Sequence, residues 1–280
     1  MSQAKKVFTR MCLNNWGGID HKVLEFHEYV NLFSGKSGSG KSTVMDAIQV
    51  ILYGSFSPSF LNKAADDAKN RRSVLSYLRG EQKDGSANRK DCDFCSVIAL
   101  EIEDTGTHII TCIGIAFEVR KSDSEIKKFV YFSHSGKMPE SEYLTEQGVC
   151  YSNQEIKKLV SARTKSDDNR GKGEVNRIYG SKEAYLGTLY DVILGYIDQN
   201  RFITMEKSAI ALKMTNGTGQ FIRDYMFPKN TSNTIATISE QLDSYRQIKD
   251  KIEDLRKRIE ILTDIQTSGQ ELVRLQSDKI

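Results

Sequence analysis

GKSGSGKS at residues 35–42 satisfies the phosphate-loop pattern GxxxxGK[ST] at every fixed position. The apolar run from Tyr29 to Phe33 precedes this octet, and we expect it to form a strand. Ser42 to Gly54 follows the octet, with apolar residues at helical spacing and a glycine at the end. Strand, glycine loop and helix stand in the order that the motif requires. The stretch therefore predicts an α/β fold of the P-loop nucleotide-binding class.

The octet also predicts the cofactors, which are ATP and Mg²⁺. Successive backbone N–H groups of the loop are expected to surround phosphate oxygens, and the helix that follows adds the positive end of its dipole. Lys41 is expected to reach the β- and γ-phosphates and is a candidate catalytic residue, whereas the Ser42 hydroxyl should ligate Mg²⁺. The predicted binding residues of the loop are Gly35, Lys36, Ser37, Gly38, Ser39, Gly40, Lys41, Ser42 and Thr43.

Composition and charge argue against several other classes of protein. The 280 residues include 40 Lys and Arg against 37 Asp and Glu, so a net charge of +3 gives no global electrostatic drive toward nucleic acid. Apolar runs are far shorter than the roughly 18 residues of a membrane span, and no secretory signal is recognised at the start. Five cysteines, an odd number, fit free thiols in a reducing compartment. We expect a cytoplasmic protein with no membrane contact.

Stretches in which apolar and polar residues alternate predict a β-rich region around the phosphate loop. Charged residues crowd 161–176, which we expect to be a mobile loop, and Glu183 to Ile197 and Gln220 to Phe227 are helical candidates. The expected strands are Val7 to Leu13, Lys22 to Phe26, Cys95 to Glu103, Thr107 to Val119 and Lys128 to Ser133.

A possible zinc pattern overlaps one of these strand pairs. Cys92, Cys95, His108 and Cys112 have zinc-like spacing. A turn at 104–106 pairs residues whose numbers sum to about 210, which sets Cys95 and Cys112 about 10 Å apart along the strands. This separation argues against a shared ion.

Heptad spacing marks the end of the chain. Tyr245, Ile252 and Ile259 occupy one apolar position, and Ile248, Leu255 and Leu262 occupy the other. This pattern predicts a lobe at 1–230 followed by the start of a coiled-coil arm at 235–280. A long amphipathic helix on a globular body is the alternative. A coiled-coil helix needs a partner helix, either in another chain or in another part of the protein.

Several stretches resemble a known group of ATPases. GKSGSGKSTVMDAIQVIL is similar to the nucleotide loop and first helix of the SMC, Rad50 and MukB group of ABC-type ATPases, and LNNWG at 13–17 is similar to its first strand. The heptad tail resembles the root of its coiled-coil arm. SVLSYLRG at 73–80 and FIRDYMFP at 221–228 resemble stretches in the condensin-like ATPase subunit of the bacterial Wadjet plasmid-defence systems.

The resemblance implies an ABC-type, SMC-like N-terminal half-head with a β-rich lobe and a coiled-coil root. It implies an ATP-driven motor on DNA, in which two heads enclose two ATP molecules. The implied partners are the C-terminal half of the head, a second head, kleisin-like and winged-helix-type subunits, a nuclease, and circular plasmid DNA. A Rad50-like or RecF-like repair ATPase is the alternative within the group, and a P-loop kinase or a nucleotide-binding scaffold is the alternative outside it.

Parts of the group's ATPase site have no counterpart in the chain. We find neither a signature loop of the LSGGQ type nor a strand ending in Asp-Glu, and YIDQ at 196–199 and NGTGQ at 216–220 are rejected as substitutes. We therefore expect an ATPase that binds ATP but is inactive alone.

Two further residues are candidates for the nucleotide site by the same resemblance. Gln199 is a candidate catalytic residue and Mg²⁺ ligand, or else an ordinary polar residue at a helix end. Asn15 and Trp16, at the end of the first strand, are candidate adenine contacts because an amide or aromatic group there could pack on the base, although Trp16 also fits a plain core residue.

Basic residues gather between the first helix and the next strand. They are a candidate DNA-backbone contact, or else a solvated loop. They are Lys69, Arg71, Arg72, Arg79, Lys83, Arg89 and Lys90.

Overall fold

The computed structural model describes most of the first 210 residues and a few positions near the end. The described residues are 5–36, 38–57, 61, 73–82, 85–167 and 175–210, with Ile252, Glu253, Leu255, Arg258, Ile259, Leu262 and Thr263 in the C-terminal part. The chain divides into two compact units, Met1–Lys213 and Met214–Ile280. The predicted boundary between 230 and 235 stays a prediction.

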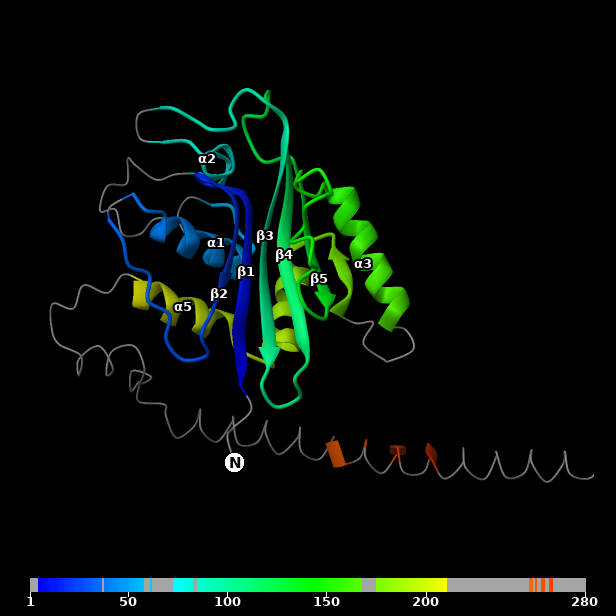
Figure 1. Cartoon of the computed structure of the whole chain (residues 1–280). Coiled ribbons are helices and arrows are strands. Elements are labelled where there is room, and N and C mark those ends of the chain that lie inside the picture. Colours follow the sequence, from blue (N-terminus) through cyan, green and yellow to red (C-terminus); the bar gives the residue numbers. More distant parts are fainter. Residues whose placement is uncertain are drawn as a thin grey trace, which may run out of the picture. The chain divides into compact units, whose positions relative to one another are not determined.

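A six-stranded sheet forms the centre of the first unit (Figure 1). Its strand order is β2-β1-β3-β4-β5-β6, and every neighbouring pair is antiparallel. The predicted β-rich region is therefore confirmed. The strands are β1 (Lys6–Trp16), β2 (Ile19–Glu25), β3 (Phe94–Asp104), β4 (Ile110–Val119), β5 (Lys128–Ser135) and β6 (Arg177–Tyr179).

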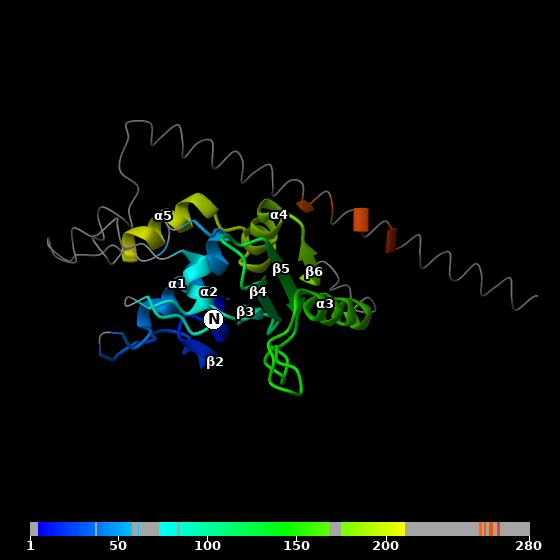
Figure 2. The same ribbon diagram turned by 90° about the horizontal axis from the view of Figure 1, so that it is seen from above.

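Helices cover both faces of this sheet, so alternate side chains of the central strands enter two separate cores. Met11 and Leu13 of β1 belong to one core, whereas Cys12 between them belongs to the other. The first core contains α1 (Lys41–Tyr53), α2 (Val74–Arg79), α4 (Lys182–Gly187) and the π-helical turn η4 (Thr188–Ile193), and α5 (Gln199–Ile210) packs against it. The opposite face carries α3 (Asn153–Asp167), as Figure 2 shows from above.

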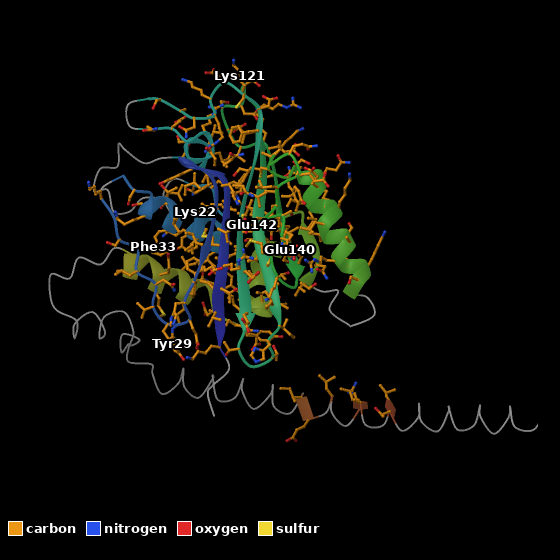
Figure 3. The ribbon with its side chains drawn as sticks, viewed as in Figure 1. Lys22, Tyr29, Phe33, Lys121, Glu140 and Glu142 are labelled. Carbon is orange, nitrogen blue, oxygen red and sulfur yellow. The ribbon has the colours of Figure 1, made fainter. Side chains whose placement is uncertain are left out.

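A loop between β5 and α3 closes the second face over β1 and β2. Glu142 lies at its centre (Figure 3), and its carboxylate accepts from Arg10 at 3.0 Å and contacts His21 Nε2 at 2.8 Å. Its carbonyl accepts from Asn14 Nδ2 at 2.8 Å. Glu142 and Tyr143 both have positive φ, at 51° and 60°, which is unfavourable for residues with a side chain. The contacts to the two strands hold this conformation in place.

Helix α1 agrees with its prediction to within one residue at each end. It runs from Lys41 to Tyr53, and Gly54 ends it in the left-handed conformation with φ 53°. Gly54 N donates to Val50 O at 3.0 Å, which satisfies one carbonyl of the last turn.

The predicted register of the β3–β4 hairpin is wrong, because each residue of β3 lies opposite a residue three positions later in β4 than predicted. Glu101 lies opposite Cys112, and Glu103 lies opposite Ile110, so paired numbers sum to 213 rather than 210. The turn is wider than three residues because Asp104 Oδ1 accepts from the N–H groups of both Gly106 and Thr107.

Helix α3 contradicts the predicted mobile loop over residues 161–167. A reciprocal cap begins it, in which Ser152 N donates to Glu155 Oε2 at 2.7 Å and Glu155 N donates to Ser152 Oγ at 3.3 Å. Ile156 and Val160 are buried against the sheet. One apolar stripe therefore suffices for a helix whose other face is polar. The rest of the predicted loop up to 174 lies outside the described residues.

The apolar run before the phosphate loop does not form the expected strand. Tyr29, Val30 and Leu32 have no regular secondary structure and are 69%, 76% and 89% exposed. Figure 3 labels Tyr29 and Phe33 at the two ends of this run. Within the described part of the chain, no strand pairs with the run, and an extended segment needs a hydrogen-bonded neighbour to become a strand.

In the second unit the described residues are helical. Ile252, Leu255, Ile259 and Leu262, the predicted heptad positions, are 47–63% exposed. The remainder of 235–280, the 221–228 stretch and the 216–220 segment lie outside the described residues, so the coiled coil itself stays a prediction.

Candidate nucleotide-binding site

Glycines shape the phosphate loop in front of α1. Gly38 and Gly40 have φ of 84° and 87°, which side chains with a Cβ rarely adopt. At Gly35 an added Cβ would lie 2.6 Å from Ser39 Oγ, so a larger residue there would displace the Ser39 side chain. Ser37 lies outside the described residues.

The start of α1 offers unopposed positive charge. Gly40 is its N-cap and provides no side-chain acceptor, and the first turn contains no acidic residue. The first N–H groups of a helix have no partner within the helix, and the dipole makes this end attractive to anions. Ser42 in this turn is exposed. These features fit a phosphate group with its Mg²⁺.

The Lys41 ammonium folds back into the loop. Its Nζ donates to Gly35 O at 2.7 Å, to Lys36 O at 2.9 Å and to Ser39 Oγ at 3.2 Å. An ammonium group has three donors, and all three are used. Phosphate oxygens would have to replace some of these contacts, and their charge makes the exchange favourable.

Three tyrosine hydroxyls hold the opposite end of α1. Tyr185 donates to Ile51 O at 2.9 Å, Tyr190 to Leu52 O at 3.0 Å and Tyr131 to Gly54 O at 2.6 Å. The last carbonyls of a helix otherwise lack partners, and a buried unpaired carbonyl is costly. The C-terminal end of α1 is thus fixed to α4, η4 and β5.

At the N-terminal end, the neighbour of α1 is the β1–β2 turn. Trp16 Nε1 donates to Thr43 O at 2.9 Å, and an added Cβ on Gly17 would lie 2.5 Å from Thr43 Cγ2. Trp16 is fully buried and stacks on Tyr77, so it is a core residue rather than a base contact. The Thr43 contact with the α-phosphate stays a prediction.

Asn15 has its amide occupied. Its Nδ2 donates to Cys95 O at 2.7 Å, and its backbone is left-handed with φ 55°. Its role as an adenine contact stays a prediction.

Gln199 begins α5, which contacts the C-terminal half of α1 and the η4 turn. Glu206 accepts from Gln49 Nε2 at 3.1 Å, and Phe202 packs edge-on against Tyr190 at 5.7 Å. Among the described residues, no hydrogen bond joins the Gln199 side chain to the phosphate loop. Its proposed part at Mg²⁺ stays a prediction.

Two of the predicted DNA-contacting arginines hold the fold together instead. Arg89 is 7% exposed and donates to Leu78 O, Gly17 O and Asp20. Arg79 donates to the carbonyls of Lys121 and Asp123. Lys90 is exposed, and the other members of the basic group lie outside the described residues.

The cysteines cannot share one metal ion. The corrected register pairs Cys95 with Glu118 and Cys112 with Glu101, so six strand positions, about 20 Å, separate the two thiols. Burial raises the pKa of Cys95 to about 11 and that of Cys112 further still, which keeps both thiols protonated.

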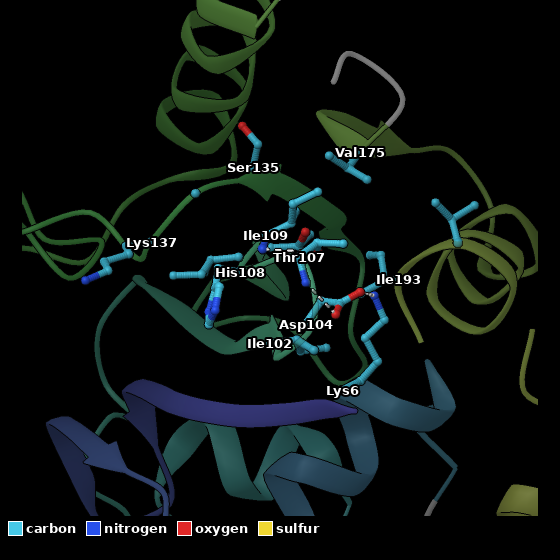
Figure 4. A pocket seen from close by; sticks show the side chains of 14 residues that line it. Lys6, Ile102, Asp104, Thr107, His108, Ile109, Ser135, Lys137, Val175 and Ile193 are labelled. Atoms are coloured by element: carbon cyan, nitrogen blue, oxygen red, sulfur yellow. Dashed lines mark hydrogen bonds and ion pairs between the residues drawn. The ribbon is translucent and has the colours of Figure 1, made fainter. Parts of the chain in front are cut away.

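A separate cavity of about 450 Å³ lies at the far end of β1 (Figure 4). Ile102, Ile109 and Ile193 line it, and Lys6 at its edge is paired with Asp104 at 2.6 Å. Lys6 and Trp16 are ten strand positions apart, about 33 Å, so this cavity is remote from the phosphate loop.

Comparison with known proteins gives one family. The sequence profile of the AAA domain family matches residues 10–279. No curated protein matches the chain. No helix among the described residues is long and apolar enough to cross a membrane.

Two solved structures are similar at low identity. One comes from work on ATP-driven dimerization and DNA-stimulated activation of SMC ATPases; it is 15% identical, with a TM-score of 0.30, over 59% of this chain and 84% of its own. The other is the recombination mediator protein RecF with ATP; it is also 15% identical, with a TM-score of 0.31, over 77% of this chain and 47% of its own. With the family match over nearly its whole length, the chain belongs to the AAA domain family and has the predicted α/β P-loop fold.

Proposed function

We propose that this chain is the N-terminal half of the ATPase head of an SMC-like motor that acts on DNA. It binds ATP and Mg²⁺ through Gly35 to Thr43, with Lys41 at the β- and γ-phosphates and Ser42 on the metal. The observation that carries the proposal is the phosphate loop itself. Its glycines, the start of α1 without a side-chain cap and the inward-folded Lys41 support an anion site.

The exposed run at 29–33 supports a second, complementary half. Burying Tyr29, Val30 and Leu32 would contribute about 1.5–3 kcal/mol for each large apolar side chain. The run leads directly into the phosphate loop, so a strand from the C-terminal half of the head that paired with it would join the two halves at the nucleotide. The missing signature loop and Asp-Glu strand would come from the same source and from a second head.

Within this class we favour the condensin-like subunit of a Wadjet plasmid-defence system. Its support is the similarity of the 73–80 and 221–228 stretches, the first of which forms α2 beside α1. Such a subunit would act with kleisin-like and winged-helix-type subunits and a nuclease on closed circular DNA. A Rad50-like or RecF-like repair ATPase is the alternative. ATP turnover of the assembled head, measured with closed circles and with linear DNA of equal length, separates the two, because the plasmid-defence subunit is expected to prefer closed circles.

Calorimetric titration with Mg-ATP tests the binding site. The full chain should bind with a measurable dissociation constant, and Lys41→Ala should abolish binding because the β- and γ-phosphates lose the ammonium group of the motif's fixed lysine. Lys22→Ala, which removes an exposed lysine on β2, is the matched control and should bind like the unmodified chain. Equal affinity of Lys41→Ala and the unmodified chain would remove the core of the proposal.

A further inference from the structure

A buried carboxylate lies on the phosphate-loop helix, five residues after Lys41. Asp46 is 3% exposed, and the hydroxyl of Tyr77 on α2 donates to its Oδ2. A charged group is kept in a core only when hydrogen bonds compensate its lost hydration. The pair therefore ties the first half of α1 to α2, and moving either helix would break it.

Trp16 extends this pair to the first turn of α1. Its ring lies flat on Tyr77, with ring centroids 5.1 Å apart and planes 6° apart, and its Nε1 donates to Thr43 O. One aromatic stack thus connects two points on α1, Thr43 and Asp46. These points lie on the turn that carries Lys41 and Ser42 and on the turn after it.

The backbone segments around the Trp16–Tyr77 stack are closely packed. Gly17 N donates to Tyr77 O at 2.7 Å, and a Cβ on Gly80 would lie 2.6 Å from Gly17 O. Gly17 in turn touches Thr43, as described above. The end of α2, the β1–β2 turn and the first turn of α1 are therefore in direct contact, and a shift of one moves the others.

We propose that Trp16, Asp46 and Tyr77 are positioning residues for the nucleotide: they set the orientation of the first turn of α1, and with it Lys41 and the loop N–H groups, without touching the ligand. The inference rests on the proposed nucleotide binding. The independent anchoring of the far end of α1 by Tyr131, Tyr185 and Tyr190 makes the idea testable, because one helix carries buried tyrosine contacts at both ends.

The test compares Tyr77→Phe with Tyr190→Phe. Each change removes one buried hydroxyl that holds α1, so both should lower the urea midpoint of unfolding. Only Tyr77→Phe should weaken Mg-ATP binding in calorimetry, by about tenfold, the size of a lost hydrogen bond to a charged group. Asp46→Asn keeps an acceptor for the hydroxyl and should bind within about threefold of the unmodified chain, whereas Asp46→Ala should resemble Tyr77→Phe.

Two further variants complete the experiment: a double variant of Asp46 and Tyr77, and a substitution of Trp16. In Asp46→Ala, adding Tyr77→Phe should cost no further affinity, because the shared contact is already lost. Trp16→Phe keeps a stacked ring but removes the donor to Thr43 O; it should also weaken binding, and it carries the test where Tyr77→Phe does not fold.

The outcomes are distinct. Binding by the unmodified chain with unchanged affinity in Tyr77→Phe and Trp16→Phe would overturn this inference alone. Equal weakening in Tyr190→Phe would also overturn it, since the effect would then follow general stability. Failure of the unmodified chain to bind Mg-ATP would overturn the proposed function and this inference together.

Discussion

His134 on β5 is fully buried beneath the loop that carries Tyr143. Its Nδ1 lies 3.0 Å from Ser135 O and its Nε2 lies 2.9 Å from the Tyr143 hydroxyl. A neutral imidazole meets both partners, donating from Nδ1 and accepting at Nε2. Burial lowers the pKa of His134 to about 4, and the charge of Arg163 acts in the same direction. Glu101, the nearby carboxylate, opposes this shift.

This residue makes stability fall in mild acid. Between about pH 6.5 and about pH 4 the unfolded chain binds a proton at this histidine that the folded chain does not, so lower pH favours unfolding. The loss reaches about 3 kcal/mol at the low end of the window. Urea unfolding at several pH values between 7 and 4.5 measures how the free energy of unfolding changes with pH. This change should be smaller in His134→Gln than in the unmodified chain. Identical slopes would contradict the assignment.

At the residue scale, the roles that could be predicted from the sequence are those of residues within one local motif. Lys41 and Ser42 could be assigned a role because the phosphate loop is contiguous, and their placement follows from eight adjacent residues. Tyr77 could not, because its partner Asp46 is 31 residues away and no periodicity joins them. The one available signal was that both residues lie in stretches that resemble the same ATPase group.

Strand β4 contains a glycine where two neighbours come close. A Cβ on Gly114 would lie 2.5 Å from Ile98 O and 2.8 Å from Phe132 Cζ. Gly114→Ala should therefore lower the free energy of unfolding by about 1–3 kcal/mol, since β3 and β5 would have to move. Gly180→Ala is the matched control, because no described atom lies within 4 Å of its added Cβ, and its effect should stay within about 0.5 kcal/mol. Equal urea midpoints for the two variants would contradict this packing.

At the element scale, strong periodicity was reliable and weak periodicity was not. Helix α1 was predicted closely because its apolar stripe ends at a glycine. Helix α3 could not be predicted over 161–167 because its apolar stripe is narrow among many charges and its Ser152–Glu155 cap begins nine residues before this stretch. The hairpin register failed because Asp104 bonds two turn N–H groups and His108 adopts φ 55°. Side-chain bonds of this kind change a turn by whole residues without altering the strand pattern.

At the scale of the whole molecule, binding and turnover should separate. We expect the chain alone to bind Mg-ATP with negligible hydrolysis, because it contains no recognisable signature loop or Asp-Glu strand. Adding a chain that supplies both should start turnover, and Lys41→Ala should stop it again. Phosphate release assays with and without the second chain measure this. Turnover by the chain alone, with phosphate passed to a small molecule, would favour a P-loop kinase instead.

The contact between Trp16 and Thr43 has an optical consequence. The chain contains one tryptophan, so all of its indole emission comes from a ring that is shielded from water and bonded to the helix bearing Lys41. The protein thus has an intrinsic spectroscopic label at the phosphate loop, and the wavelength and intensity of its emission report on this region alone, without any attached dye.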